Sequence, residues 1–509
     1  MNILYLVNTY PIVEPMGTLQ LSSIMKARGH RSFICAIDIE SVFEKIEKHR
    51  VDAIACSFMS TEVTSFHLLI PEIRKQYPYI PIIAGGPHPT YYPQIIDTWP
   101  LDALVVGEGD HVIGELLENL YSGKDISHLS NVHTKFFKNP QGNLVENLDT
   151  LPFSDRELLK DVAPFKYIPM KSFFATRGCP YSCSYCFNSA FNKMHRDKGE
   201  VLRHRSVENL IQELEHVKRT SKMDFVRFGD DTFVMKYDAW VEEFCDKYPK
   251  RVGLPFYFLI HPNLASEELI SNLKKAGCHS IMLGIESGNE HVRRKVLDRY
   301  VADATIKKAF NLYRKYDIKV FSNTILGLPE TTLKEDLESL NFTLDCHPFY
   351  SGFTVFTPFP GTTLGEYSKA KGYVKGSDDF ANSFPISMQA GSILNTVTDK
   401  QREIHRNILV LAPTANLFPW LRKLIVNHLI YWKPNVFFNV LGFMTRNYCN
   451  MKIWPFSKSM YTFVQIFNKV IHVDQKNYMR KTTHAVEDLH KFEEIRLQAT
   501  QVTLFTNDC

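Results

Sequence analysis

The chain is short of cysteine, of long apolar runs and of charge of one sign, and each shortage excludes a class of protein. Ten cysteines in 509 residues are too few for a disulfide framework. Uncharged runs such as 80–96 and 407–421 contain proline and fall short of the ~20 apolar residues that cross a bilayer. Lys plus Arg (59) nearly balances Asp plus Glu (55), which argues against a nucleic-acid partner. The first residues lack the basic flank and cleavage site of a secretion signal, so a cytoplasmic location is expected.

Basic and aromatic residues gather at the C-terminal end. Residues 401–509 hold 14 Lys or Arg against 7 Asp or Glu, which leaves 45 against 48 in the rest of the chain. The same segment carries sixteen aromatic residues. Such a mixture suits peripheral contact with an anionic membrane surface, or binding of a lipid-like substrate. The alternative is that the aromatic side chains pack this segment onto the rest of the protein.

The composition, 44% hydrophobic and 22% charged, is that of a globular protein, and the length predicts two or three domains. Residues 1–125 alternate short apolar runs with amphipathic segments. This alternation predicts an α/β domain of the Rossmann-like (flavodoxin-like) type, a parallel sheet with helices on both faces and with ligands at the carboxyl ends of its strands. The expected strands are 2–7, 33–36, 53–57, 82–84 and 103–106, and the expected helices are 19–28, 39–49 and 61–76.

Residues 126–165 are rich in Asn, Pro and Asp and are expected to form a linker. Over residues 166–378 the alternation returns with six strands, which predicts a partial (β/α)6 barrel of the TIM type with its chemistry at the strand C-termini. The pattern by itself does not separate a barrel from an open sheet. Residues 379–509 are expected to form a mostly helical C-terminal domain. The strands expected in the barrel are 173–176, 225–228, 256–259, 280–283, 319–325 and 353–356, and the helices are 207–219, 239–247, 266–276, 302–315 and 332–344.

Three closely spaced cysteines, Cys179, Cys183 and Cys186, follow the first of these strands. Three thiolates at this spacing can hold an iron–sulfur cluster and leave one iron without a protein ligand, whereas an electron-transfer cluster of four irons has four cysteines. A structural zinc site also has four protein ligands. A three-cysteine zinc knuckle completed by a remote ligand, or a chance grouping, remains the alternative.

The segment 176–186, Thr-Arg-Gly-Cys-Pro-Tyr-Ser-Cys-Ser-Tyr-Cys, resembles the cluster-binding loop of the radical S-adenosylmethionine (SAM) enzymes. The turns Gly-Gly-Pro-His at 85–88 and Gly-Glu-Gly-Asp at 107–110 look like those of the cobalamin-binding domain that precedes many such cores, as in proteins related to the anaerobic magnesium-protoporphyrin monomethyl ester cyclase. The resemblance implies a 4Fe-4S cluster, SAM and cobalamin as cofactors, and it favours the barrel over the open sheet. It also implies cobalamin contacts at Ser57, Gly85, Gly86, Gly107 and Glu108.

One departure from other cobalamin proteins concerns the cobalt ligand. The chain has no Asp-x-His-x-x-Gly motif, so a histidine from that loop is not expected to ligate cobalt. His88 is therefore interpreted as a turn residue. The alternative to cobalamin binding is that residues 1–125 form a nucleotide-type domain that binds no cofactor or serves another purpose.

The resemblance also implies residues for SAM. Gly229 and Asp230 stand where the family has a Gly-Gly-Glu-like segment that holds the amino group of SAM, although Phe228 replaces the first glycine. Asp230 or Asp231 is equally compatible with an ordinary loop acid. Glu286 is expected to bind the ribose hydroxyls, because a carboxylate accepts two hydrogen bonds at once, with a structural ion pair as its alternative.

Two further segments of the family contact the adenine. Ile325 and Gly327 lie in a segment similar to the one on which adenine rests, and Tyr185 is expected to cover the same base. Arg177 adjoins the cysteine loop, where it either offsets the negative charge of a cluster or pairs with a surface acid.

The implied activity is that of an enzyme that cleaves SAM reductively to a 5′-deoxyadenosyl radical. With cobalamin, methyl transfer to an unactivated carbon of a small-molecule substrate is the leading hypothesis. Radical oxidative cyclisation or rearrangement is the alternative within the family, and a non-catalytic cobalamin or iron–sulfur sensor is an alternative of another class. An external electron donor such as flavodoxin or ferredoxin is implied.

Overall fold

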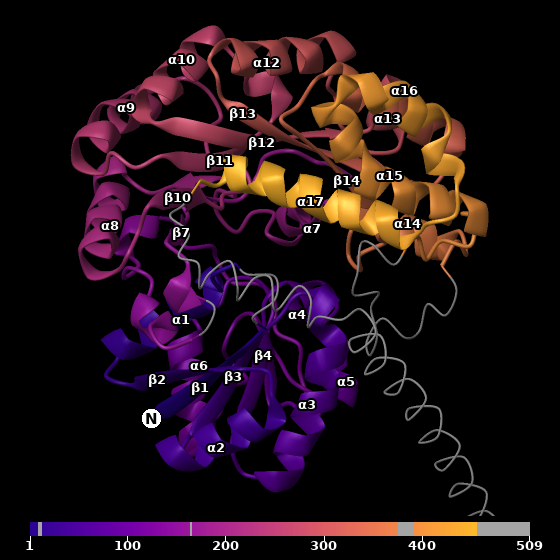
Figure 1. The fold of residues 1–509 in the computed structure, drawn as a ribbon. Coiled ribbons are helices and arrows are strands. Elements are labelled where there is room, and N and C mark those ends of the chain that lie inside the picture. The colour runs from indigo at the N-terminus through magenta and orange to yellow at the C-terminus, as the bar shows by residue number, and fades with distance from the viewer. Residues whose placement is uncertain (9–12, 163–164, 375–390, 456–509) are drawn as a thin grey trace, which may run out of the picture. The chain divides into compact units, whose positions relative to one another are not determined.

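The first sheet has the strand order expected of a flavodoxin-like domain. The computed structural model describes residues 1–8, 13–162, 165–374 and 391–455 (Figure 1), and the chain up to residue 456 forms one compact unit. The sheet order is β2-β1-β3-β4-β5-β6, with β1 to β5 parallel. The order reverses between β1 and β3, which is where ligands bind in such sheets. The strands are β1 (Asn2–Val7), β2 (Arg31–Ala36), β3 (Ala53–Ser57), β4 (Ile82–Gly85) and β5 (Ala103–Val105).

Both faces of this sheet are buried, as the alternating pattern predicts. In β1, Ile3 and Tyr5 belong to one core, and Leu4 and Leu6 belong to another. One face is covered by α1 and α6, and the other by α2, α3 and α5. The helices are α1 (Met16–Ala27), α2 (Ile39–His49), α3 (Val63–Gln76), α4 (Pro87–Tyr91), α5 (Ile95–Thr98) and α6 (Ile113–Ser122).

Part of the segment expected to be a linker belongs to the first sheet. Strand β6 (Val132–His133) pairs antiparallel with β5, so the sheet extends beyond residue 125. Two residues give too short a periodic pattern for sequence reading to detect. The rest of 126–162 is irregular apart from short 3-10 turns.

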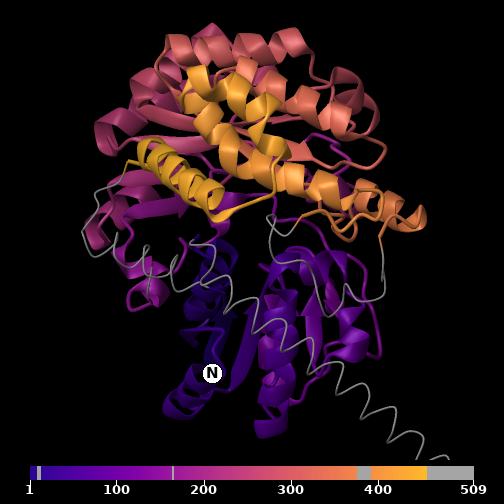
Figure 2. The same ribbon diagram turned by 45° about the vertical axis from the view of Figure 1, so that its right-hand side comes forward.

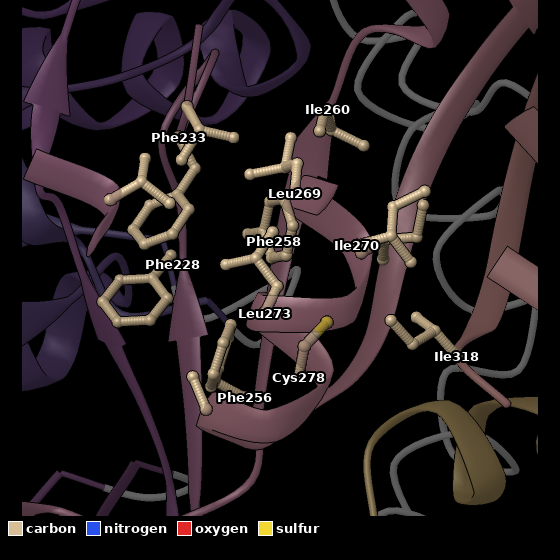
Figure 3. Packing of buried hydrophobic residues seen from close by; sticks show 14 of the residues in the cluster. Phe228, Phe233, Phe256, Phe258, Ile260, Leu269, Ile270, Leu273, Cys278 and Ile318 are labelled. Carbon is tan, nitrogen blue, oxygen red and sulfur yellow. The ribbon is translucent and has the colours of Figure 1, made fainter. Parts of the chain in front are cut away.

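The second sheet is wholly parallel, in the order β14-β13-β12-β11-β10-β7. Its outer helices bury a core rich in phenylalanine, of which Figure 3 shows Phe228, Phe233, Phe256 and Phe258. The strands are β7 (Met170–Phe173), β10 (Phe225–Phe228), β11 (Phe256–Ile260), β12 (Cys278–Glu286), β13 (Lys319–Leu326) and β14 (Tyr350–Val355), and the helices are α8 (Val207–Thr220), α9 (Ala239–Arg251), α10 (Glu267–Ala276), α11 (Glu290–Lys295), α12 (Asp303–Lys315), α13 (Leu333–Asp345) and α14 (Thr363–Ala370).

The C-terminal helices share cores with the barrel. Helix α15 (Asp399–Leu417) packs Ile408 and Leu411 against Leu326 of β13. Helix α17 (Val436–Ile453) contacts β12, β13 and β14, and it lies along these strands in Figures 1 and 2. The short helix α16 (Arg422–Asn427) lies between them in sequence. The predicted helical character is thus confirmed for 391–455, while 379–390 and 456–509 lie outside the described residues. Among the described helices, none has the length and apolar character that a bilayer crossing needs.

Candidate functional site

The cysteine loop begins at a short hairpin-like ladder that the sequence reading did not separate from the first barrel strand. Strand β8 (Thr176–Arg177) pairs antiparallel with β9 (Arg203–His204). Gly178 follows with φ +90°, and a Cβ at this position would lie 2.2 Å from the carbonyl oxygen of Val201. Only glycine fits this conformation and this space, so Gly178 sets the path of the chain into Cys179.

Each of the three cysteines has a hydrogen-bond donor at its sulfur. Thr232 Oγ1 lies 3.4 Å from Cys179 Sγ. Asn188 Nδ2 lies 3.7 Å from Cys186 Sγ. A third donor, described below, reaches Cys183. Donors aimed at sulfur stabilise a ligated thiolate and tune the metal group it holds.

Burial disfavours ionisation of Cys179 and Cys186. Cys179 and Cys183 are buried, and burial raises the pKa of Cys179 and raises that of Cys186 to about 12. A bound metal group is what holds such cysteines as thiolates. Within the described residues, no three His, Cys, Asp or Glu side chains converge to hold one metal ion. In a cubane each cysteine binds a different iron, so the three-cysteine loop with its sulfur-directed donors fits a cluster.

A buried polar group stands at the carboxyl ends of β12 and β13. Glu286 has φ +64°, and the register between β12 and β13 shifts at this point. Asn323 Nδ2 donates to Glu286 Oε2 at 3.2 Å. Burial raises the pKa of Glu286, although Arg299, Asn323 and the Tyr185 hydroxyl each offset part of that rise. Strained backbone and a strand irregularity at a buried carboxylate are typical of ligand sites.

Arg299 is a candidate site residue that sequence reading missed. Its side chain is 7% exposed. Its Nη1 donates to Cys183 Sγ at 3.8 Å and its Nη2 to the carbonyl oxygen of Gly284 at 2.8 Å. Although burial lowers it, the pKa of Arg299 is raised overall by Tyr185, Glu286 and Cys183. Arg299 lies 113 positions after Cys186 in an otherwise ordinary charged segment, so only the fold reveals it.

The paired acids after β10 take different places. Asp230 is fully buried and accepts hydrogen bonds from the backbone N–H and the hydroxyl of Thr176, and burial raises its pKa to about 7. Asp231 is exposed, yet desolvation by the surrounding protein raises its pKa, although a hydrogen bond with Asn188 offsets part of that rise. Asp231 interacts electrostatically with Cys179 and Cys186. Of the two acids, Asp231 is therefore the better placed to meet a ligand at the cysteine loop.

The residues expected to hold adenine partly come together. Tyr185 packs against the apolar cluster that contains Ile325. Gly327 has φ +64°, and its space is limited by His405 of α15, whose Cε1 would lie 3.1 Å from a Cβ there. His405 Nε2 lies 2.7 Å from Asp336 Oδ2, and Asp336 Oδ1 accepts from the Gly327 N–H at 2.9 Å. The C-terminal helix thus fixes this segment. Gly229 is limited by the ring of Phe174, 3.1 Å from its Cβ position.

A cavity of about 360 Å³ lies at the carboxyl ends of β1, β3, β4 and β5. Its floor has little side-chain bulk. Gly86 has φ +88°, and a Cβ there would lie 2.7 Å from Ser57 Oγ. Such a cradle of small residues lets a large flat cofactor approach the backbone. All five residues expected to contact cobalamin line this cavity: Ser57, Gly85, Gly86, Gly107 and Glu108.

The Gly-Glu-Gly-Asp turn also joins the first sheet to the barrel. Glu108 pairs with Arg203 at 2.6 Å, and Arg177 pairs with Asp110 at 2.8 Å and with Glu108 at 3.4 Å. Although burial raises it, the pKa of Glu108 is lowered overall by these arginines. Arg177 therefore pairs with acids, as one interpretation predicted, but the acids are at a domain junction. A Cβ at Gly107 would lie 2.6 Å from the side-chain oxygen of Gln141.

His88, interpreted from the sequence as a turn residue, belongs instead to a short helix. It lies in α4, fully buried, with Nδ1 3.0 Å from Ser60 Oγ. Burial lowers its pKa to about 4. His88 is not among the residues that line the cavity.

A further contact between the first domain and the cysteine loop comes from the end of α4. The ring of Tyr91 stacks on Phe187, with centroids 4.5 Å apart, and its hydroxyl donates to the Phe187 carbonyl oxygen at 3.1 Å. Phe187 directly follows Cys186 and begins helix α7 (Phe187–Met194). Two stacked aromatic rings thus lie directly beside the cysteine loop.

Comparison with known proteins agrees with both halves of this site. Residues 173–343 match the model of the radical SAM superfamily, and residues 3–117 match that of the B12 binding domain. An uncharacterised methyltransferase of Pyrococcus horikoshii is 24% identical to this chain, and the alignment covers 70% of this chain and 78% of the length of that protein. The anaerobic magnesium-protoporphyrin IX monomethyl ester cyclase of Rubrivivax gelatinosus is 23% identical, and the alignment covers 77% of this chain and 74% of the length of the cyclase.

Among solved structures, the chain resembles the radical SAM methyltransferase TsrM from Kitasatospora setae with cobalamin and a 4Fe-4S cluster bound. The TM-score is 0.60 at 16% identity, over 73% of this chain and 75% of that one. At this identity the likeness concerns the fold. It agrees with a first domain of the cobalamin-binding type followed by a partial barrel.

Proposed function

We propose that this chain, which the two domain matches identify as a radical SAM enzyme with a B12-binding domain, methylates an unactivated carbon of a small molecule. One observation carries the proposal. The cavity of the first sheet is also lined by Thr176 and Arg177 of β8, and Cys179 follows that strand after a single residue. The expected cobalamin site and the cysteine loop therefore adjoin, as a reaction that uses both cofactors requires.

The chemistry belongs to the cofactors and the positioning to the chain. When bound, the cluster with SAM supplies a radical that takes hydrogen from an unactivated carbon, and cobalamin supplies a methyl group. In this proposal Tyr185 and Ile325 hold the adenine, and Glu286 accepts hydrogen bonds from the ribose hydroxyls. Arg299 binds the carboxylate of the methionine part, since a guanidinium offers paired donors to a carboxylate. Asp231 accepts from its amino group.

Exclusion of water is a second task of the chain. The Tyr91–Phe187 stack closes the side of the cysteine loop that faces the first domain. The ion pairs of Arg177 with Asp110 and of Arg203 with Glu108 join the first domain to strands β8 and β9 beside the cavity. These contacts favour a closed space in which a reactive carbon radical is protected from solvent and oxygen.

Radical cyclisation is the second candidate, because one of the relatives is named as an anaerobic cyclase and aligns with 77% of this chain. The two reactions differ in the fate of the methyl group. With SAM labelled at its methyl carbon, methylation transfers the label to the substrate. A product that lacks the label while 5′-deoxyadenosine is released favours cyclisation or rearrangement.

The proposed partners are an electron donor such as flavodoxin or ferredoxin and a small, lipid-like substrate. Support for the substrate class, and for peripheral membrane contact, comes from the aromatic and basic C-terminal segment. A cytoplasmic location is proposed on the chemistry of the cysteines. Every cysteine among the described residues is a free thiol, and free thiols with a labile cluster suit a reducing compartment.

The decisive experiment is anaerobic reconstitution with iron, sulfide and cobalamin, followed by incubation with SAM and dithionite. We expect absorption of both cofactors and release of 5′-deoxyadenosine. Cys183→Ala should lose the cluster absorption and the release, whereas Cys245→Ala, a free cysteine outside the loop, should keep both. An intact cluster that releases no 5′-deoxyadenosine would refute the enzyme and leave the sensor alternative.

A further inference from the structure

One side of helix α17 carries a continuous row of exposed apolar side chains. Val436 is 76% exposed, Phe437 69% and Met444 62%. Apart from the neighbours Val436 and Phe437, the members recur every three or four positions, so they lie on one side of the helix, and they extend over about 22 Å of it. We call this row the α17 stripe; it consists of Val436, Phe437, Val440, Met444, Tyr448 and Met451.

The opposite side of α17 is anchored, so the stripe cannot turn inward. A Cβ at Gly442 would lie 2.6 Å from the carbonyl oxygen of Val410 in α15, which shows how closely the two helices approach. Cys449 and Ile453 are fully buried and share a core with Tyr257 and Tyr350 of the barrel. The outward direction of the stripe is therefore a fixed feature of the fold.

The stripe belongs to a wider concentration of exposed apolar side chains. Of the 21 large apolar residues exposed in the described part of the chain, eleven fall within residues 418–451. Trp420 is 78% exposed and Trp432 is 58% exposed, and the Trp432 ring lies 6.4 Å from that of Phe438 at the start of α17. Apolar patches of this kind mark interaction surfaces, and tryptophan is enriched at the level of lipid headgroups.

The charge of this region has one sign. Residues 404–473 contain eight Lys or Arg and no Asp or Glu. Lys433 and Lys452 stand just before and near the end of α17, and both are exposed. Neither they nor Lys423 has an acidic partner among the residues that the structure describes. Apolar side chains flanked by unpaired lysines are complementary to an anionic bilayer surface.

We infer that the α17 stripe docks this enzyme onto an anionic membrane surface. Its apolar side chains enter the headgroup region, and Lys433 and Lys452 contact lipid phosphates. A second copy of the chain fits less well, because a two-fold symmetric contact would place the same positive face against itself. Since the other side of α17 packs on the barrel, docking brings lipid to within one helix diameter, ~10 Å, of the barrel core. The docking itself does not depend on the proposed methyl transfer.

The test is co-sedimentation of the reconstituted full-length enzyme with vesicles of phosphatidylglycerol and phosphatidylcholine in equal parts, or of phosphatidylcholine alone. We expect binding to the anionic vesicles that weakens with salt. Lys433→Gln with Lys452→Gln should weaken that binding roughly 20- to 30-fold, since each lysine near an anionic surface contributes about a factor of five. Phe437→Ser with Met444→Ser should weaken it at least tenfold.

A matched control uses two exposed aromatic residues of the first domain. Phe136 and Tyr79 are 95% and 94% exposed, and changing both to Ser should leave vesicle binding unchanged. Release of 5′-deoxyadenosine without vesicles should be the same in all variants, which separates docking from catalysis. An equal loss of binding in control and stripe variants would overturn the proposal, as would a wild-type enzyme that ignores both vesicle types.

Other occupants of the stripe give distinct results. One such result is a dimer in light scattering. If the double variant Phe437→Ser with Met444→Ser is then a monomer, the stripe is assigned to contact with a second copy of the chain. Protection of Trp432 from acrylamide quenching before vesicles are added assigns it to another part of this chain. Retention on heparin without vesicle binding assigns the lysines to a different polyanion. Each of these results overturns docking on lipid.

Discussion

Replacing Asp230 by Asn should change the way the stability of this protein depends on pH. Asp230 is fully buried, and its Oδ1 accepts hydrogen bonds from Thr176. Its Oδ2 has no hydrogen-bond partner among the described residues. Asn keeps the acceptor for Thr176 and removes the titration. The perturbation therefore isolates the ionisation of a single carboxyl group.

The magnitude follows from the pKa. Burial raises the pKa of Asp230 from 3.8 to about 7, and each pKa unit corresponds to about 1.4 kcal/mol, so ionisation in the folded state costs roughly 4 kcal/mol. Below pH 3.8 the group is protonated in the folded and unfolded states, and it has no effect. Between pH 3.8 and about pH 7, Asp230 is ionised in the unfolded chain but still protonated in the folded protein. The free energy of unfolding therefore falls as the pH rises, until the folded state also ionises near pH 7.

The assay is urea unfolding, monitored by circular dichroism under anaerobic reducing conditions from pH 5 to pH 8. Between these limits the stability of Asp230→Asn relative to wild type should rise by roughly 3 kcal/mol. Asp317→Asn, at a carboxylate whose side chain is 88% exposed, should show no such trend. A difference that stays constant from pH 5 to pH 8 would refute the reasoning.

Three further predictions concern the cysteine loop and its neighbours. Gly178→Ala should abolish cluster binding, measured as iron per chain, because the new Cβ would lie 2.2 Å from the carbonyl oxygen of Val201. The control Gly123→Ala, where the space around the new Cβ is open, should bind iron normally. Arg299→Leu should keep the cluster but bind SAM about 10- to 100-fold more weakly in equilibrium dialysis, which is the effect of losing a charge-assisted hydrogen bond; unchanged affinity contradicts the role. His405→Ala should raise the KM for SAM and leave cobalamin absorption unchanged, and an unaltered KM contradicts its positioning role.

Much of the architecture was predictable because it is written in local patterns. The strands 2–7, 53–57 and 225–228 and the helix 39–49 were predicted with the bounds that the structure shows, since their apolar spacing reflects only the faces they bury. The other predicted strands and helices differ from the observed ones by a few residues at their ends, and helices such as α6 (Ile113–Ser122) were not predicted. Strands β6, β8 and β9 were missed because two residues hold no periodicity.

The candidate site was predictable where one short segment carries it. The three cysteines lie within eight residues, and Ser57, Gly85, Gly86 and Gly107 follow strand ends that meet at one edge of the sheet. Their shared location follows from the strand order. The roles of these residues toward cofactors stay predictions, to be tested by the reconstitution experiments.

The sequence by itself determined the cofactor class and the order of the domains, because cysteine spacing and strand–helix alternation are properties of neighbouring residues. Only the tertiary structure decided that Arg299 reaches a cysteine 116 positions away, that Asp230 is fully buried whereas Asp231 is exposed, and that His405 packs against Gly327. It also decided which side of α17 is exposed. Such pairings depend on how distant elements pack, and packing places single side chains that no local pattern distinguishes.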